Sequence, residues 1–255
     1  MRLDLPLHKL EDYTSGAQRA RVVTEPWAEE NLYCPGCASR RLHSFKANTP
    51  AKDYRCPSCE EIFQLKSQKK PFATRIQDAA YSKMCEAIEQ DEIPNFFALH
   101  YDPERWRVRN LTLIPRFAIS LSAIEKRNPL SPSAERHGWV GCNILLEFVP
   151  AEARISVIAN GIPVKPALVR KQFERLRPFK GMGVKVRGWT LDVLNVVRSL
   201  GKIEFTVEEV HAAKHLFERL HPANRHVRHK VRQQLQILCA LRFIERIAPG
   251  RYRLT

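Results

Sequence analysis

Apolar residues cluster in two ways along the chain, as short runs in the first part and at helical spacing toward the end. Four apolar runs are typical of buried strands, namely residues 95–101, 108–114, 143–146 and 155–158. The spacing of Ala80, Met84 and Ile88 predicts a helix over residues 78–88, and residues 6–33 read mainly as helix. We therefore expect the first part of the chain to form a mixed α/β core.

The end of the chain has a more regular helical pattern. One helix is expected from Trp189, and a second opens at Thr206, where Thr206 and Glu209 form a capping box. A third is expected from about residue 225 to residue 241, and a short hairpin with a turn at Pro249-Gly250 follows. Three helices followed by a two-stranded wing predict a winged helix, which is a variant of the helix-turn-helix.

One short strand in the first part carries polar residues on a single face. Successive side chains of a strand point to opposite faces, so Ile62, Gln64 and Lys66 share one face of residues 61–66. Phe63 and Leu65 share the other face. Polar groups two residues apart, opposite an apolar face, predict a strand that lines a cleft.

Two Cys-x-x-Cys pairs precede this strand, and the second pair lies in the turn directly before it. Cys34 and Cys37 form the first pair, and Cys56 and Cys59 form the second. This spacing is typical of a zinc ribbon, because each tight turn supplies two thiolates to a tetrahedral ion. Four sulfur ligands leave no position for water, so we expect a structural Zn²⁺ rather than a catalytic one.

Asp53 precedes the second cysteine pair, and Gln64 and Lys66 follow it. In metal-dependent phosphodiesterases, an Asp and a following (Asp/Glu)-x-Lys place two acids around Mg²⁺, while the Lys orients the attacking water. Gln64 offers only a neutral carbonyl oxygen, so we expect weaker metal binding here. Strand alternation would place Glu60, not Glu61, on the face of Gln64. The alternative is an ordinary hairpin whose polar residues face solvent.

Positive charge is concentrated in the last third of the chain. The net charge is +15, and residues 165–255 carry 20 Lys and Arg against 7 Asp and Glu. Such asymmetry indicates binding to a polyanion, although a solvated basic surface is the alternative.

The third C-terminal helix carries the side chains that read base edges in the major groove. They crowd its beginning and one face: Arg225, His226, Arg228, His229, Arg232, Gln233 and Gln236. We therefore predict that it is a DNA recognition helix. A charged face that only keeps the domain soluble, and a winged helix that binds protein, are the alternatives.

Composition narrows the class of protein further. The chain has 255 residues, of which 44% are hydrophobic, and it contains no apolar run long enough for a membrane span. The N-terminus lacks the apolar segment of a secretory signal, so we expect a cytoplasmic protein without a membrane partner. In a reducing compartment, paired cysteines favour a metal over a disulfide.

Residues 126–141 are rich in Pro, Ser, Arg and Gly and predict a long loop. Trp139 lies near its end between Gly138 and Gly141. An aromatic residue in a basic loop could contact a base of DNA, and the alternative is a loop residue that is anchored in the core.

Several segments together resemble the DpnI-like methyladenine-directed restriction endonucleases over nearly the whole chain. The matching segments, in order, are the two cysteine pairs, Asp53, Gln64-Leu65-Lys66, Asn95-Phe96-Phe97, Gly138-Trp139-Val140-Gly141-Cys142-Asn143, Arg187-Gly188-Trp189-Thr190 and Arg232-Gln233-Gln234-Leu235-Gln236-Ile237-Leu238. The resemblance implies an α/β (α+β) nuclease core of the PD-(D/E)xK type with an embedded four-cysteine zinc ribbon, over residues 1–180. It further implies a linker over 181–187 and a C-terminal winged-helix domain over 188–255.

The resemblance also implies an activity. A type II, methyl-directed restriction endonuclease hydrolyses both strands of DNA at GATC sites whose adenine carries an N6-methyl group, using Mg²⁺ or Mn²⁺. The catalytic positions of the family fall on Asp53, Gln64 and Lys66, of which Asp53 and Gln64 would hold the metal, and the methyl-sensing tryptophan falls on Trp139. The family has Glu where this chain has Gln64.

Two other functions remain open at this point. The chain could be a non-catalytic protein that binds methylated DNA, or a transcription regulator with a zinc ribbon and a winged helix. In every case the expected partner is double-stranded DNA, and a monomer is expected.

Overall fold

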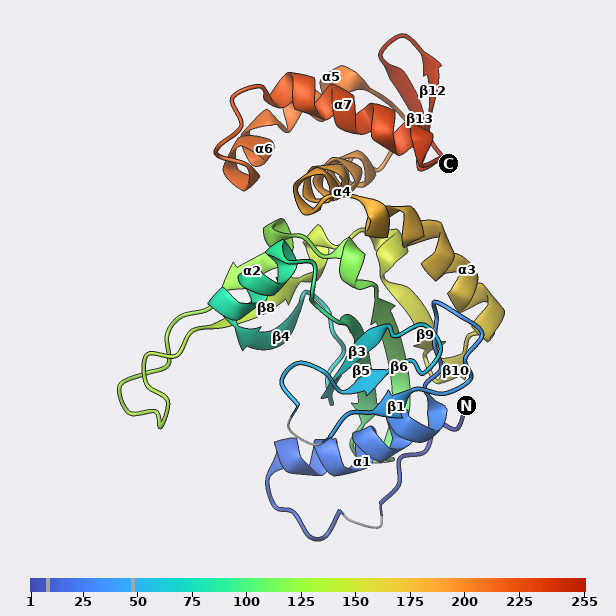
Figure 1. Ribbon diagram of the computed structural model, residues 1–255, viewed down its shortest axis with the longest axis vertical. Helices are drawn as coiled ribbons and strands as arrows, with labels where there is room; N and C mark the ends of the chain where they lie inside the picture. The colour runs from blue at the N-terminus through green and yellow to red at the C-terminus, as the bar shows by residue number, and fades with distance from the viewer. Residues whose placement is uncertain (8–9, 47–48) are drawn as a thin grey trace.

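The computed structural model describes residues 1–7, 10–46 and 49–255 (Figure 1). The part of the expected N-terminal helix at residues 8 and 9 therefore lies outside the described residues. The chain folds into a mixed α/β body followed by a smaller helical unit with its own small sheet.

A mixed sheet forms the centre of the first unit. Its strands, in spatial order, are β1 (His43–Ser44), β2 (Tyr54–Arg55), β3 (Ile62–Gln68), β5 (Asn95–Asp102), β6 (Arg107–Ile114), β9 (Ile155–Ala159) and β10 (Ile162–Pro163). Neighbouring strands pair antiparallel, except that β3 and β5 pair parallel with Phe63 opposite Asn95. Apolar side chains from the central strands, such as Phe97 and Leu111, are buried. Three of the four apolar runs therefore form central strands, as the sequence predicts.

A second, smaller sheet lies beside the first. It consists of β4 (Arg75–Ala80), β8 (Gly141–Leu145) and β7 (Ile124–Lys126), and α2 (Tyr81–Glu89) follows β4. The prediction of a helix from residue 78 is wrong at its start. Asp78 pairs with Cys142, and Ala80 pairs with Gly141 across a bulge, so sheet pairing overrides the helical pattern until Tyr81. Met84 and Ile88 are buried on α2, as expected.

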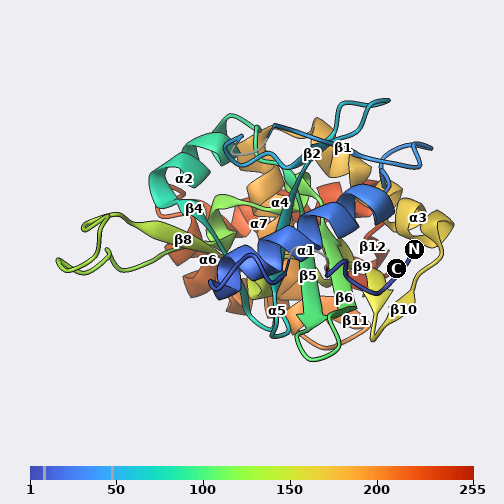
Figure 2. The same ribbon diagram turned by 90° about the horizontal axis from the view of Figure 1, so that it is seen from below.

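One long helix, α1 (Gly16–Asn31), crosses a face of the central sheet (Figure 2). Its buried side includes Val23 and Trp27, and the Thr24 hydroxyl lies 3.2 Å from the Ser67 hydroxyl of β3. A second helix, α3 (Pro166–Leu176), buries Val169, Phe173 and Leu176. Short 3-10 turns join these elements: η1 (Arg116–Ala118), η2 (Leu121–Ala123), η3 (Leu146–Phe148), η4 (Ala151–Ala153) and η5 (Arg177–Gly181).

The C-terminal unit is a winged helix. Its elements are α4 (Val184–Ser199), β11 (Glu204–Thr206), α5 (Val207–Ala212), α6 (Lys214–Leu220), α7 (Val227–Ala240), β12 (Ile244–Ala248) and β13 (Arg251–Leu254). The predicted capping box is present, since Thr206 Oγ1 accepts from Glu209 N at 3.2 Å and Glu209 Oε2 accepts from Thr206 N at 2.7 Å. The expected second helix is interrupted at Ala213, which separates α5 from α6. The wing includes β11, which pairs with β13.

The helix α4 lies between the two units (Figure 1). It begins at Val184, inside the segment that was expected to be a linker, so Met182 and Gly183 are the residues between η5 and α4. One side of α4 bonds the first unit, because Asp192 Oδ2 accepts from the Ser122 hydroxyl at 2.7 Å and Asn195 Nδ2 donates to the Phe148 carbonyl at 2.7 Å.

The other side of α4 packs on the winged helix. Trp189 stacks on Phe217 with ring centroids 5.8 Å apart, and the Thr190 hydroxyl donates to Gln234 Oε1 at 2.6 Å. Because α4 belongs to both packing interfaces, its burial joins the two units into one continuous apolar core. No helix in the described part of the chain has the length and apolar character that a membrane crossing needs.

Candidate active site and nucleic-acid interface

The four cysteines of the two Cys-x-x-Cys pairs meet at one point. Their sulfur atoms all lie within 4.8 Å of one another, with Cys34 Sγ 3.5 Å from Cys59 Sγ and Cys37 Sγ 3.4 Å from Cys56 Sγ. Tetrahedral zinc–thiolate bonds of about 2.3 Å place sulfurs about 3.8 Å apart. The cluster could therefore hold a Zn²⁺ ion with little rearrangement.

The surroundings of the cluster act differently on its thiols, since burial raises the pKa of Cys34 and raises that of Cys59 to about 11, whereas the pKa of Cys56 is lowered. Backbone N–H groups of Ser39 and Ser58 each lie 3.4 Å from a cysteine sulfur. Burial raises the pKa of Cys56, but backbone N–H donors from Ser58 and Cys59 outweigh it and lower that pKa to about 7. Arg170 of α3 donates to the carbonyls of Cys34 and Ser39, both at 3.2 Å, and so fixes the first cysteine pair against the body.

The hairpin that leaves this cluster carries Asp53 on one side and β3 on the other. Asp53 N donates to the Phe63 carbonyl at 3.0 Å, and the Asp53 carboxylate accepts from Leu65 N at 2.7 Å. Burial raises the pKa of Asp53, whereas the Leu65 N–H and the charge of Lys66 act in the opposite direction. The carboxylate is thus partly desolvated and held against the middle of β3.

Gln64 shares a cavity with Asp53. Both line a cavity of about 530 Å³ between α1 and the hairpin. Gln64 Oε1 is buried, and within residues 1–7, 10–46 and 49–255 no group donates a hydrogen bond to it. A buried acceptor without a donor is costly, because the oxygen has lost its water. A cation in the cavity would satisfy that oxygen.

Lys66 is the third expected residue of this site. Its ammonium forms an ion pair with Asp78 Oδ1 of β4, whose side chain is 2% exposed. Lys66 lowers the pKa of Asp53 by its charge, so the two groups interact across the site. Gln64 and Lys66 therefore lie on one face of β3. Asp53 and Gln64 line the cavity, whereas Lys66 is paired with Asp78 and is not among the residues that line it.

Sequence reasoning missed Asp78. Its position was assigned to a helix, and no spacing rule connects it to Lys66, since the two residues belong to different sheets. The contact arises because β4 pairs with β8 and is carried alongside β3 by that second sheet.

The expectation that Glu60 shares the face of Gln64 is wrong. Glu60 lies in the turn before β3 with φ of +60°, outside the strand, so strand alternation does not apply. Its carboxylate is largely exposed and faces Arg55 at 3.9 Å. Glu61 is buried instead, where it accepts from Asn95 Nδ2 at 2.9 Å and pairs with Lys180.

The predicted long loop is a projecting arm between β7 and β8 (Figure 1). Trp139 lies at its base, where it is half-buried and outside the apolar core. The Arg136 guanidinium lies over the Trp139 ring, 4.9 Å from its centroid. On Gly141, a Cβ would stand only 2.8 Å from two carbons of the Trp139 indole, so a side chain there would push the indole aside.

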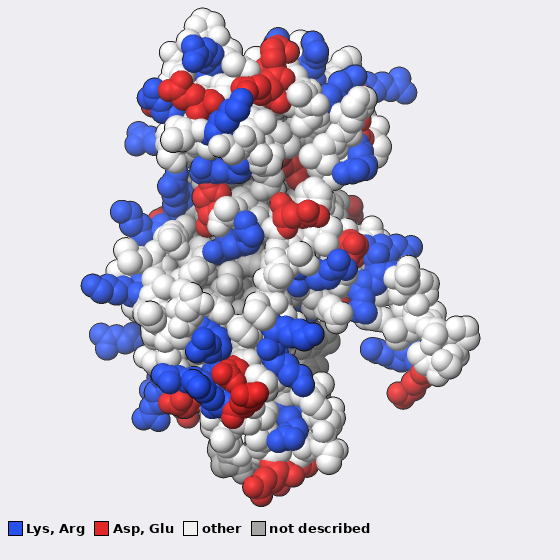
Figure 3. All heavy atoms as spheres, turned by 180° about the vertical axis from the view of Figure 1, so that it is seen from behind, with Lys and Arg blue, Asp and Glu red and all other residues white. Residues whose placement is uncertain are grey.

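All seven residues that were expected to face DNA are exposed. Two of them precede α7, namely Arg225 and His226. The other five lie along one side of α7, namely Arg228, His229, Arg232, Gln233 and Gln236. The opposite side of α7 buries Val231, Leu235 and Leu238. Figure 3 shows Lys and Arg side chains over the winged helix and the body, with Asp and Glu among them. The surface of α7 therefore has the layout of a recognition helix.

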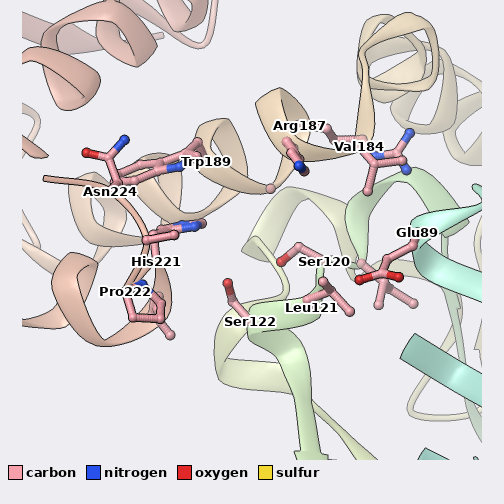
Figure 4. Close-up of a pocket in the computed structure, with 15 residues that line it drawn as sticks. Glu89, Ser120, Leu121, Ser122, Val184, Arg187, Trp189, His221, Pro222 and Asn224 are labelled. Carbon is pink, nitrogen blue, oxygen red and sulfur yellow. The ribbon is translucent and has the colours of Figure 1, made fainter. Parts of the chain in front are cut away.

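A cavity of about 670 Å³ lies between the two units beside α4 (Figure 4). His221 stacks on Trp189 with centroids 3.8 Å apart, and its Nε2 lies 2.8 Å from Asp192 Oδ2. The Ser122 hydroxyl bonds the same carboxylate oxygen, so the fully buried Asp192 ties both units together. This cavity is distinct from the one that Asp53 and Gln64 line.

Two protein-family comparisons cover almost the whole chain. The Dam-replacing family model matches residues 1–181, and the Dam-replacing HTH domain model matches residues 185–254. The boundary between the two matches falls at Met182 to Val184, where η5 ends and α4 begins.

If the four-cysteine cluster holds Zn²⁺, loss of the ion should disorganise the hairpin. Cys59→Ser leaves three thiolates and should reduce bound zinc from one equivalent per chain to a small fraction, because structural sites require all four ligands. Elemental analysis of the purified protein and its melting temperature measure this. Cys239→Ser, which changes a cysteine outside the cluster, is the control, and equal zinc content in both variants would contradict the assignment.

Proposed function

Since the chain belongs to the Dam-replacing family, we propose that it is a methyl-directed restriction endonuclease. It would hydrolyse both strands of DNA at GATC sites whose adenine carries an N6-methyl group, with Mg²⁺ or Mn²⁺ as cofactor. The observation that carries the proposal is the unpaired Gln64 Oε1 beside the Asp53 carboxylate in one cavity.

The residues of this cavity fit a divalent cation. Asp53 offers a carboxylate and Gln64 a carbonyl oxygen, and both are oxygen ligands of the kind that Mg²⁺ and Mn²⁺ prefer. A bound cation would supply Lewis-acid activation of water and would offset charge on the phosphate.

Lys66 would act beside the cation on the attacking water and the phosphate. Its ammonium lies on the same face of β3 as Gln64, and the buried Asp78 holds it in place. Asp78 is thus a positioning residue, because it orients the catalytic group without facing the cavity that Asp53 and Gln64 line. The Leu65 N–H donates to the Asp53 carboxylate and so fixes the position of that group.

DNA would be held by the winged helix and by the arm. The exposed Arg and Gln side chains of α7 suit phosphates and purine edges in the major groove. An N6-methyl group projects into that groove, where contact with the Trp139 ring would bury apolar surface worth about 1 kcal/mol. Reading the methyl twice, once in each domain, would multiply this discrimination.

The zinc cluster would have a structural role. Cys56 follows β2 and Cys59 precedes the turn into β3, so an ion there would clamp the base of the hairpin that presents Asp53, Gln64 and Lys66. Sulfur would fill all four positions around the ion and leave none for water.

A second candidate is a methyl-DNA-binding protein without nuclease activity. The neutral Gln64 favours it, because one carboxylate is missing from the usual pair around the metal. If this candidate is correct, the parent protein binds methylated duplex without cutting it, and Gln64→Glu alone creates cleavage.

The nuclease proposal predicts cleavage of fully N6-methylated GATC plasmid by the purified protein in Mg²⁺ or Mn²⁺. Unmethylated plasmid should remain intact, and Asp53→Ala should abolish cutting because it removes the cavity's charged ligand. Gel electrophoresis of the linear products measures this. If neither metal supports cutting at any protein excess, the proposal fails.

Asp78→Asn should slow cleavage while leaving DNA affinity unchanged. Loss of the ion pair frees the Lys66 ammonium, and a small misplacement of a catalytic group costs about a hundredfold in rate. Single-turnover cleavage and the Kd for methylated duplex separate the two effects. Asp102→Asn at the end of β5 is the control, and a rate equal to that of the control would remove Asp78 from the site.

Trp139→Ala should reduce the preference for methylated over unmethylated duplex by about fivefold, which corresponds to about 1 kcal/mol of lost apolar contact. Nonspecific affinity should change little. Gly141→Ala should act in the same direction, because the added Cβ displaces the indole. Fluorescence anisotropy with both duplexes gives the ratio, and an unchanged ratio in both variants would argue against the role of Trp139.

A further inference from the structure

The cavity between the two units combines apolar walls with a small number of polar groups (Figure 4). Its volume of about 670 Å³ lies within the range of small-molecule sites. The apolar part of the lining comes from α4, η2 and the end of α6, namely Ile119, Leu121, Val184, Trp189 and Leu220. These walls suit a ligand that has an apolar or flat part.

Two polar side chains that line this cavity are buried without a partner. Arg187 is 2% exposed and Ser120 is 5% exposed. Within residues 1–7, 10–46 and 49–255, neither Arg187 Nη1 nor Ser120 Oγ has a hydrogen-bond partner. Figure 4 shows both side chains pointing toward the space between α4 and η2. A buried donor without an acceptor is costly, so an acceptor in the cavity would stabilise both groups.

The charges around Arg187 favour an anion as that acceptor. Asp91 Oδ1 lies 2.5 Å from Arg187 Nη2 and 2.9 Å from Arg116 Nη1. Glu61 pairs with the same Arg116 at 3.9 Å and with Lys180. Among the described residues, this network joins three cations to two carboxylates and leaves one positive charge unbalanced. Arg187 is the member of the network that lines the cavity.

The other charged groups near the cavity do not cancel this positive charge. Lys185 and Glu89 line the cavity with opposite charges, and both are exposed. Asp192 does not line the cavity, and its Oδ2 is bonded by Ser122 and His221. Arg187 is therefore the buried charge that a ligand in the cavity would meet.

One wall of the cavity is an aromatic stack. His221 lies on Trp189 with ring centroids 3.8 Å apart, and both residues line the cavity. The half-buried His221 ring is on the side of the cavity across from Ser120 (Figure 4). Nucleobases stack on such rings, whatever their sequence, because every base has a flat π-face. A phosphate is the anion that an arginine side chain binds best together with a hydroxyl donor.

We propose that the cavity between the two units binds a mononucleotide. Its phosphate would accept from Arg187 Nη1 and Ser120 Oγ, and its base would lie against the wall that Trp189 and His221 form. This site is separate from the cavity that Asp53 and Gln64 line, and the inference does not rest on the nuclease function.

Isothermal titration calorimetry of the full-length protein with adenosine monophosphate, without DNA or added divalent metal, tests this. We expect one equivalent to bind per chain, with a Kd below about 1 mM. Inorganic phosphate and adenosine should each bind at least about tenfold more weakly, because each has only one of the two parts that the cavity contacts.

Two variants address the phosphate contacts. Ser120→Ala should raise the Kd for adenosine monophosphate about tenfold, since it removes a hydrogen bond to a charged group. Its melting temperature without ligand should not fall, because the hydroxyl that is removed has no partner in the described residues. Arg187→Lys keeps a charge beside Asp91 but removes the Nη1 donor, and it should weaken binding by a similar factor.

Ser199→Ala is the matched control, because Ser199 ends α4 outside the cavity and should leave the Kd unchanged. Arg232→Ala, on the exposed side of α7, examines binding of the nucleotide to the predicted DNA surface instead. If Arg232→Ala weakens binding and Ser120→Ala does not, the nucleotide occupies α7 and the proposal is overturned.

The remaining outcomes are equally decisive. Failure of adenosine monophosphate to bind would overturn the proposal, and so would a Kd that is the same in the parent, Ser120→Ala and Arg187→Lys. Equal affinity for inorganic phosphate and adenosine monophosphate would overturn the role of the aromatic wall and with it the mononucleotide. Loss of the nuclease proposal in the cleavage assay would leave this inference standing, because the titration uses neither DNA nor a catalytic metal.

Discussion

The short turn that connects β2 to β3 is the constraint on which the proposed active site depends. The turn is too small to have a core of its own, and residues from Cys56 to Glu60 are stabilised mainly by the four-cysteine cluster and by a few backbone bonds. Asp53 reaches β3 only because this turn sets the register, in which Tyr54 pairs with Phe63. A slip by one residue would turn Gln64 and Lys66 to the buried face of β3. The positions of the residues that line the cavity therefore depend on the four-cysteine cluster.

Lys66 connects that hairpin to the second sheet. Its partner Asp78 lies next to a bulge in β4, and the bulged residues pair with Gly141 and Cys142, just beyond Trp139. The ion pair thus links the residue that would act on the phosphate to β4, the strand that pairs with β8 at the base of the arm. A bulge adds local twist and redirects side chains, and here it separates Asp78, which is buried against Lys66, from Ala80, the residue before α2. The arm and Lys66 are thus connected through β4, which pairs with β8 and carries Asp78.

Local patterns predicted the parts of the molecule that depend on local chemistry. The cysteine pairs, the capping box at Thr206 and the apolar strands β5 and β6 all follow from spacing within a few residues, and the structure has each of them. The predictions failed where tertiary pairing or backbone conformation decides the secondary structure of a residue or the direction of its side chain. Asp78 was assigned to a helix because its pairing with Cys142 is invisible in the sequence, and Glu60 was placed on a strand although its positive φ ends the alternation.

The burial of α4 determines how the two surfaces that are proposed to contact DNA can cooperate. Domains joined by a flexible linker are expected to move relative to each other, unless a large apolar interface holds them. Here Leu191, Val193 and Leu194 of α4 are fully buried. The contacts between the units include the bonds of Asp192 to Ser122 and His221. They also include the Phe179–Phe243 ring pair, with centroids 5.3 Å apart. Opening this interface would expose apolar surface and leave the fully buried Asp192 without its hydroxyl donor. The orientation of α7 relative to the hairpin is therefore set before DNA arrives, so a duplex that binds α7 meets a cavity and an arm whose positions are already fixed.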